Sequence, residues 1–304
     1  MKSFIPWIGG KGALLHEIYP RIPKDIGTYI EVFGGGGSVL MGKSMAKNEI
    51  YNDYQRDLVN LFQVIRERPM AFLEAMKFLP LNAREEYKYI LDIIEGKQTQ
   101  YTYLEDELEI AERHFEPPLL TEIKELLTTK ATQFDVNRAV VYYKAIVYSY
   151  GASVKSYGSR TLTLHKLDAT IKRASRRLRR VVIENQDFEK LILSKDKDSS
   201  FFYCDPPYFE TEKHYDAPFT VEDHKRLYNV LSTIQGRFLL SYNDSDFIRE
   251  LYKDFNIISV SRLNNLKQRY EAGSEFKEVL IANYDIDLAP KPRPYQPDLW
   301  EDTL

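Results

Sequence analysis

The sequence contains a single cysteine, Cys204, among 304 residues. One cysteine excludes a disulfide framework and a zinc site built on several cysteines, and it is typical of a reducing cytosol. The sequence also lacks any apolar run of about 18 residues, so no segment is predicted to span a membrane. The first residues lack the apolar stretch of a secretory signal peptide, and the five histidines show no metal-ligand spacing. We therefore expect a soluble, cytoplasmic protein that holds no metal.

Neither sign of charge dominates the sequence, because 42 basic residues stand against 45 acidic ones. The distribution is nevertheless uneven. Residues 166–180 include seven basic residues and one acid, whereas residues 105–125 include eight acids and two basic residues. The basic run predicts a face that meets phosphates, and the 22 tyrosines supply candidates for stacking on bases. The alternative explanation of both charge runs is two solvated helix faces.

Two short β-prone runs near the start of the chain flank a glycine-rich turn and a helix-compatible segment. This order is typical of a doubly wound α/β sheet. The middle of the chain has helical periodicity without strand alternation, and strand-like runs then resume. We therefore expect an α/β sheet interrupted by a mostly helical insertion. The expected strands span 29–33, 49–53, 181–183, 201–204, 237–241, 257–260 and 279–283, with a turn at 34–37 and a helix at 38–47; the sheet domain spans 1–55 and 165–288, the insertion 56–164, and an extended tail 289–304.

The glycine-rich turn, Gly34 to Gly37, follows one strand and precedes a helix. Glycines there permit positive φ and let backbone amides approach a ligand at a helix N-terminus. Asp53 ends the next strand, 19 residues after Gly34, where an acid can accept hydrogen bonds from a ribose. The dinucleotide fingerprint G-x-G-x-x-G fails, because its last position falls on Val39 or Leu40. An adenosine-type ligand is therefore favoured over a nicotinamide dinucleotide, and a flexible turn is the alternative.

The tetrapeptide Asp205-Pro206-Pro207-Tyr208 comes directly after an apolar strand, at the position where α/β sheets place ligands. The exocyclic amine of adenine is a poor nucleophile. A carboxylate and a fixed main-chain carbonyl that accept both amine hydrogens would stabilise the positive charge that develops on methylation. Two prolines fix the carbonyl because they restrict φ, and the tyrosine can stack on a base swung out of the helix. A simple strand stop is the alternative.

Taken together, these segments resemble the Dam-type DNA adenine methyltransferases, which transfer a methyl group from S-adenosylmethionine to the exocyclic amine of adenine. The resemblance covers nearly the whole chain and keeps the family's motif order. The matching segments are 6–11 (PWIGGK), 29–37 (YIEVFGGGG), 51–53 (YND), 186–188 (QDF), 205–208 (DPPY), 219–224 (FTVEDH), 239–243 (LLSYN) and 278–284 (EVLIANY). The cofactor loop departs from the family in Val32, where relatives often have proline, and in its four successive glycines.

The resemblance implies a Rossmann-like methyltransferase sheet with an inserted DNA-recognition domain, S-adenosylmethionine as cofactor and double-stranded DNA as partner. It places the protein in the cytoplasm, at the nucleoid when bound to DNA. Lys11 would pair with the methionine carboxylate, and Asp187 would accept a hydrogen bond from the cofactor's adenine amine. The implied catalytic residues are Asp205, Pro206 and Tyr208, and the implied cofactor-binding residues are Trp7, Lys11, Phe33, Gly35, Gly37, Asp53, Asp187 and Phe188.

The segment 149–160, rich in Gly, Ser and Tyr, is the candidate reader of DNA sequence. In the family a hairpin from this stretch enters the groove near the target, and a mobile surface loop is the alternative. The predicted DNA-binding residues are Lys155, Tyr157 and Arg160 in this segment and Arg173 and Arg176 in the basic run. The segment matches the best-known tetranucleotide readers poorly, so the sequence leaves open whether the recognition site is GATC or another.

Two other functions stay open on the sequence alone. The same chemistry can act on RNA or on a protein amide, and a protein of this pattern can bind DNA without catalysis. The large insertion and the motif order favour DNA. The intact set Lys11, Asp53, Asp187 and Asp205 favours an enzyme. The sequence predicts neither the oligomeric state nor a protein partner, and it does not distinguish a restriction–modification enzyme from a phage or host regulatory one.

Overall fold

The computed structural model describes residues 1–78, 84–97, 102–124, 136–158, 164–209, 219–263 and 275–287. The chain forms two compact units. The first contains Met1–Lys2, Gly10–Tyr54 and the chain from Gln186 onward, and the second contains Ser3–Gly9 and Gln55–Asn185. The second unit thus includes the predicted insertion and continues beyond it to Asn185. Arg160 and the predicted tail lie outside the described residues.

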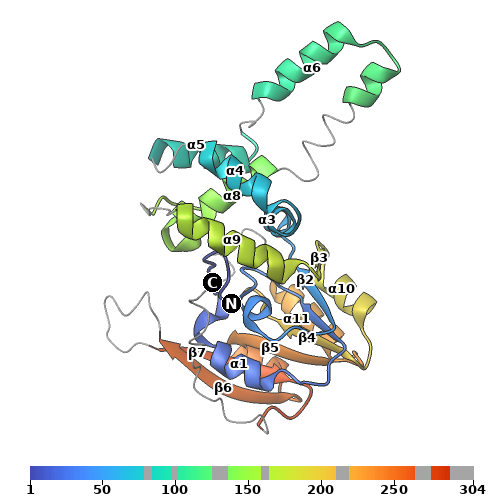
Figure 1. The fold of residues 1–304 in the computed structure, drawn as a ribbon. Helices are drawn as coiled ribbons and strands as arrows, with labels where there is room; N and C mark the ends of the chain where they lie inside the picture. The colour runs from blue at the N-terminus through green and yellow to red at the C-terminus, as the bar shows by residue number, and fades with distance from the viewer. Residues whose placement is uncertain are drawn as a thin grey trace. The chain divides into compact units, whose positions relative to one another are not determined.

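The strands form one seven-stranded sheet in the order β3-β2-β1-β4-β5-β7-β6 (Figure 1). β1 pairs in parallel with β2 and with β4, and β4 pairs in parallel with β5. β7 runs antiparallel to both β5 and β6. The α/β fold class predicted from the sequence is confirmed, and the reversed direction of β7 is an addition to it. The strands are β1 (Thr28–Glu31), β2 (Asn48–Asn52), β3 (Val181–Glu184), β4 (Ser200–Cys204), β5 (Arg237–Asn243), β6 (Asn256–Leu263) and β7 (Glu275–Ala282).

The central strand β4 is buried at all five residues. Its apolar run therefore suits a parallel strand covered on both faces. In the register, Phe202 lies between Ile30 of β1 and Phe238 of β5. Three helices bury apolar residues in the same core, with Leu191, Leu227 and Ile248 fully enclosed. These helices are α10 (Phe188–Lys195), α11 (Val221–Leu231) and α12 (Asp246–Leu251).

The helices that precede β2 in the chain are all short. The predicted helix 38–47 is shorter in the structure, where α2 (Ser38–Gly42) ends at Gly42. Lys43 is extended and its buried ammonium pairs with Glu49 of β2, so the chain turns toward the sheet at this point. The remaining short elements are α1 (Leu15–Ile18) and the 3-10 helices η1 (Lys11–Ala13) and η2 (Tyr19–Arg21).

The second unit is helical over most of its described residues. Helix α8 is its centre, because residues Ala139 to Ile146 are all buried and α3, α4 and α5 pack on it. Among the described residues, no helix is long and apolar enough to cross a membrane, and no group of three or more metal-ligating side chains comes together. The elements are α3 (Arg56–Glu67), α4 (Pro69–Phe78), α5 (Arg84–Ile94), α6 (Thr102–His114), α8 (Val136–Tyr148), η3 (Tyr150–Ala152) and α9 (Leu164–Leu178).

Candidate active site

The glycine loop after β1 is held against the end of β2. The Asp53 carboxylate accepts a hydrogen bond from the Gly35 N–H at 2.8 Å, and the Tyr51 hydroxyl donates to the Gly35 carbonyl at 2.7 Å. Gly35 and Gly37 have positive φ. A Cβ on Gly34 would lie 2.2 Å from the Tyr51 ring, so only glycine permits this approach. Asp53, which was predicted to bind the ligand, therefore also holds the glycine loop in this conformation.

Asn52, the last residue of β2, joins two loops at the same edge of the sheet. Its buried side-chain amide donates to the Val32 carbonyl at 2.9 Å and to the Gln186 carbonyl at 3.1 Å, and its oxygen accepts from the Gln186 N–H at 2.9 Å. This role of Asn52 was not predicted from the sequence. The available signal was an asparagine that ends the strand directly before Asp53. Asn52 thereby fixes the residue next to Asp187.

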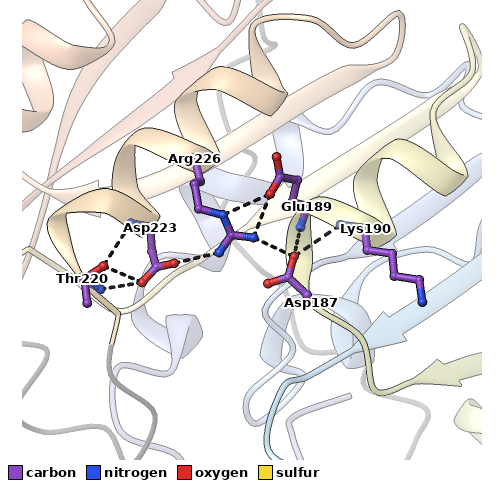
Figure 2. A network of polar contacts seen from close by, with 6 residues as sticks. All are labelled: Asp187, Glu189, Lys190, Thr220, Asp223 and Arg226. Carbon is purple, nitrogen blue, oxygen red and sulfur yellow. Dashed lines mark hydrogen bonds and ion pairs between the residues drawn. The ribbon is translucent and has the colours of Figure 1, made fainter.

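Asp187 begins α10 as its N-cap. Its Oδ1 accepts hydrogen bonds from the backbone N–H groups of Glu189 at 3.0 Å and Lys190 at 3.4 Å, and from Arg226 Nη2 at 3.0 Å. Among the described residues, no donor contacts its second oxygen, Oδ2. Figure 2 shows the Arg226 guanidinium between Asp187, Glu189 and Asp223. The carboxyl of Asp187 is therefore fixed through one oxygen while the other is left as an acceptor.

Arg226 is held by charge from three sides. Glu189 accepts from its Nε at 3.0 Å and its Nη2 at 2.8 Å, and Asp223 accepts from its Nη1 at 2.8 Å. Hydrogen bonds to Glu189 above all, then to Asp223 and Asp187, hold the pKa of Arg226 above its usual value. Asp223 also forms the capping box of α11 with Thr220. Arg226 was not predicted from the sequence. The available signal was its position three residues after Asp223 on a helix, a spacing at which opposite charges pair.

Three phenylalanines pack together beside this network. The rings of Phe33 and Phe188 lie 5.5 Å apart, and each lies 5.7 Å from the ring of Phe219. The Arg226 guanidinium lies 4.8 Å from the Phe188 ring centroid, which is a cation–π distance. Phe33 follows β1 and Phe188 follows β3, so the structure brings together two predicted residues that are far apart in sequence.

Asp205 directly follows β4 and is held by two side chains. Lys11 Nζ lies 2.7 Å from its Oδ1, and the Ser241 hydroxyl donates to the same oxygen at 2.9 Å. Burial raises the pKa of Asp205, and the Lys11 ammonium acts in the opposite direction. One fifth of the Asp205 side chain is exposed, so solvent can reach it although Lys11 and Ser241 hold one of its oxygens. Pro206 beside it is buried.

Tyr208 lies inside the core with only 6% of the residue exposed. Its hydroxyl donates a hydrogen bond to the buried Glu278 of β7, and its ring lies 6.2 Å from that of Phe276 in a stacked arrangement. Lys11 Nζ lies 4.7 Å from the Tyr208 ring centroid and 3.9 Å from Glu278 Oε2. The methionine carboxylate was the partner expected for Lys11, and in the structure the ammonium faces two carboxyl groups of the protein.

The comparison with known proteins decides the family. A model of the D12 class N6 adenine-specific DNA methyltransferases matches residues 7–266. The chain belongs to this family. It is therefore an enzyme that methylates adenine in DNA, and it requires a methyl donor. This assignment favours DNA over the RNA and protein-amide alternatives, and catalysis over binding alone.

Several named methyltransferases are similar over almost their full length. The type II methyltransferase M1.LlaDCHI of Lactococcus lactis subsp. cremoris is 26% identical, over 93% of this chain and 96% of the relative. M.MjaIII of Methanocaldococcus jannaschii is 29% identical, over 93% and 99%. A DNA adenine methylase of Vibrio cholerae is 24% identical, over 95% and 98%.

The described part of the segment predicted to read DNA, residues 149–158, lies in the second unit and forms a loop closed by a single bridge. Ser149 and Tyr157 make an antiparallel bridge, and the Gly158 N–H donates to the Tyr148 carbonyl at 2.6 Å. Lys155 is exposed in this loop, whereas the half-buried Tyr157 packs with its ring 5.7 Å from the Tyr87 ring. Lys155 is thus presented to solvent, and Tyr157 helps to close the loop.

Most of the basic run lies on α9, and Arg179 and Arg180 directly follow its end. The apolar residues Leu167, Ile171, Ala174 and Leu178 are buried at helical spacing. Arg173 and Arg176 are exposed, together with Lys166, Lys172, Arg179 and Arg180.

Trp7 is half-buried and also belongs to the second unit. The structure therefore assembles all the predicted cofactor residues except Trp7 in the first unit, and the described DNA-binding residues in the second.

Proposed function

We propose that this methyltransferase uses S-adenosylmethionine and methylates the 6-amino group of an adenine extruded from double-stranded DNA. The observation that carries the proposal is the position of Asp205 and the glycine loop in one unit. Both follow adjacent parallel strands, β4 and β1, so both lie at the edge where α/β sheets bind ligands.

The residues of the first unit fit S-adenosylmethionine. The loop from Gly34 to Gly37 lets the backbone approach a ligand closely, and Asp53 stands at the strand end where a ribose diol is bound in this class of sheet. The Phe33 and Phe188 rings supply an apolar wall for an adenine, and Oδ2 of Asp187 supplies an acceptor for its amine. These groups match a sugar and a base, which are the two parts of an adenosine.

When bound, the cofactor supplies a methyl group on a positively charged sulfur. The adenine nitrogen forms the new N–C bond while the C–S bond breaks and its electron pair stays on sulfur. The nitrogen is cationic until it loses a proton. The Asp205 carboxylate and the backbone carbonyl fixed by Pro206 accept hydrogen bonds from the amine, so they stabilise this charge as it develops.

The target amine of duplex DNA is engaged in a base pair, so the adenine must leave the stack to reach Asp205. Tyr208 is the residue proposed to stack on it. Its hydroxyl is bound to Glu278 and 6% of the residue is exposed. Stacking on an extruded base therefore requires more of the ring to be uncovered than in this structure. Arg173 and Arg176 would contact phosphates, while Lys155 and Arg160 would contact base edges.

The test is incubation of the purified chain with double-stranded DNA and methyl-labelled S-adenosylmethionine, followed by mapping of the modified bases. The expected product is N6-methyladenine at a defined set of sites. Label on cytosine, on RNA alone or on protein would contradict the proposal. Asp205→Asn serves as the matched control, because it keeps the size of the side chain and removes the charge.

A further inference from the structure

Glu278 is a buried carboxylate that the chemistry described so far does not use. It lies in the middle of β7, opposite Asn243 of β5 and Val260 of β6, and its exposed fraction is 0%. A glutamate is rarely enclosed in this way unless it is paired. Two partners are present, because the Tyr208 hydroxyl donates to it and Lys11 Nζ lies 3.9 Å from its Oε2.

Lys11 creates an electrostatic difficulty for the proposed reaction. Its ammonium lies 2.7 Å from Asp205 Oδ1, and the Lys11 side chain is almost fully buried. A cation at this distance cancels much of the negative charge of Asp205 in a poorly screened site. The neutral pair that results is a weak partner for an amine that becomes cationic during methyl transfer.

Glu278 removes this difficulty, because it places a second carboxyl group near the same ammonium. One cation then faces two acidic side chains of the protein. Glu31 is a further carboxyl group that interacts electrostatically with Asp205. It adds little negative charge at neutral pH, because burial raises the pKa of Glu31 to about 8. With Asp205 and Glu278 ionised and Lys11 protonated, these three side chains together carry one negative charge.

We propose that Glu278 is a positioning residue that balances the charge of Lys11 and so keeps the charge of Asp205 available to the target amine. The proposal rests on the proposed function, since it takes the methyl group to be transferred beside Asp205. The positive charge starts on the sulfur of the donor and ends on the adenine nitrogen, which then releases a proton. Both charges would develop beside Asp205, so the balance of charge there would act on both.

This role differs from a purely structural one in its effect on two ligands. S-adenosylmethionine has a positive sulfur, whereas its product S-adenosylhomocysteine has a neutral one. Loss of the charge of Glu278 must weaken binding of the first ligand more than the second. Loss of packing or of the Tyr208 hydrogen bond would weaken both alike.

The experiment measures the affinity of the full chain for both ligands by calorimetry, together with kcat on double-stranded DNA at saturating cofactor. In Glu278→Gln, which keeps an acceptor for Tyr208, we expect the preference for S-adenosylmethionine to fall by about threefold or more. We expect kcat to fall at least about tenfold. Glu49→Gln is the matched control, because Glu49 is also buried and paired with a lysine, Lys43. It should leave the preference unchanged.

Two further variants keep the proposal open to refutation if Glu278→Gln does not fold. Glu278→Asp retains the charge and should retain the ligand preference. Lys11→Met removes the cation and should raise the preference for S-adenosylmethionine. An unchanged preference in a folded Glu278→Gln, or in Lys11→Met, overturns the proposal. Failure of the wild-type chain to bind either ligand would instead contradict the proposed function.

Discussion

Glu31 makes the stability of this methyltransferase depend on pH in an unusual direction. The residue ends β1, is 2% exposed, and accepts a hydrogen bond from the Tyr29 hydroxyl at 2.8 Å. Burial raises the pKa of Glu31 from 4.5 to about 8, although the Tyr29 hydrogen bond acts against this. The folded protein therefore keeps a proton that the unfolded chain releases above pH 4.5. The contribution of Glu31 to the free energy of unfolding is complete below pH 4.5 and is lost as the pH rises through the folded-state pKa of about 8.

The shift sets the size of the effect. A change of one pKa unit corresponds to about 1.36 kcal/mol, so the shift of Glu31 corresponds to about 4–5 kcal/mol of unfolding free energy. Glu31→Gln keeps an acceptor for Tyr29 and cannot ionise. We compare the free energy of unfolding of this variant with that of wild type at each pH. The difference in favour of the variant should increase by an amount of that order as the pH is raised from 5 to 8.5. Urea denaturation at several pH values measures it.

Tyr29→Phe is the control for this prediction. Without the hydroxyl, the Glu31 carboxylate loses the hydrogen bond that lowers its pKa. The loss of stability with rising pH should then begin at the same pH and extend to a higher one. The reasoning is refuted if wild type and Glu31→Gln show the same pH dependence of unfolding. It is also refuted if Glu31→Gln becomes less stable relative to wild type as the pH rises.

Four further predictions concern the site. Asp53→Ala should weaken S-adenosylmethionine binding by about 1.5–3 kcal/mol, and unchanged affinity by calorimetry would remove Asp53 from the site. Arg226→Met should weaken the same binding several-fold without changing kcat at saturating cofactor, because it releases the carboxyl that caps α10; a changed kcat would contradict this. Arg160→Ala should relax discrimination between DNA sites by about 1–3 kcal/mol, whereas Arg176→Ala should weaken binding to all sequences and flatten its salt dependence. Asp205→Ala should lower methyl transfer at least about 10²-fold while cofactor binding changes little, and a folded variant with near-wild-type activity would refute the mechanism.

The two predictions that rest on hydrogen-bonded acids need matched controls. Asp53→Asn keeps an acceptor for the Gly35 N–H, so it separates the loss of the loop contact from the loss of charge. Glu189→Gln keeps a partner for Arg226 and leaves the N-cap of α10 intact, so its effect should be smaller than that of Arg226→Met. Thermal melts of each variant distinguish altered binding from an altered fold.

Much of the fold and part of the site could be predicted from local sequence. Apolar runs such as 201–204 predict buried strands, because a strand covered on both faces has no polar alternation. The glycine run and the Asp-Pro-Pro-Tyr tetrapeptide follow such strands, and strand ends of a parallel sheet meet at one edge. The predicted α/β fold class is accordingly confirmed. The family resemblance rests on the same local segments, and the family is shown.

Tertiary structure alone decided which side chains neutralise one another. Lys11 and Glu278 are separated by almost the whole chain, and no local pattern relates them; they meet because β7 inserts antiparallel between β5 and β6. Arg226 reaches Asp187 for a similar reason, since α10 and α11 pack on the same core. Periodicity reports which face of an element is buried, whereas ion pairs between elements depend on where packing places each backbone. The position of Asp205 at the end of a buried strand could therefore be predicted from the sequence, whereas the charged groups around it were decided only by the fold.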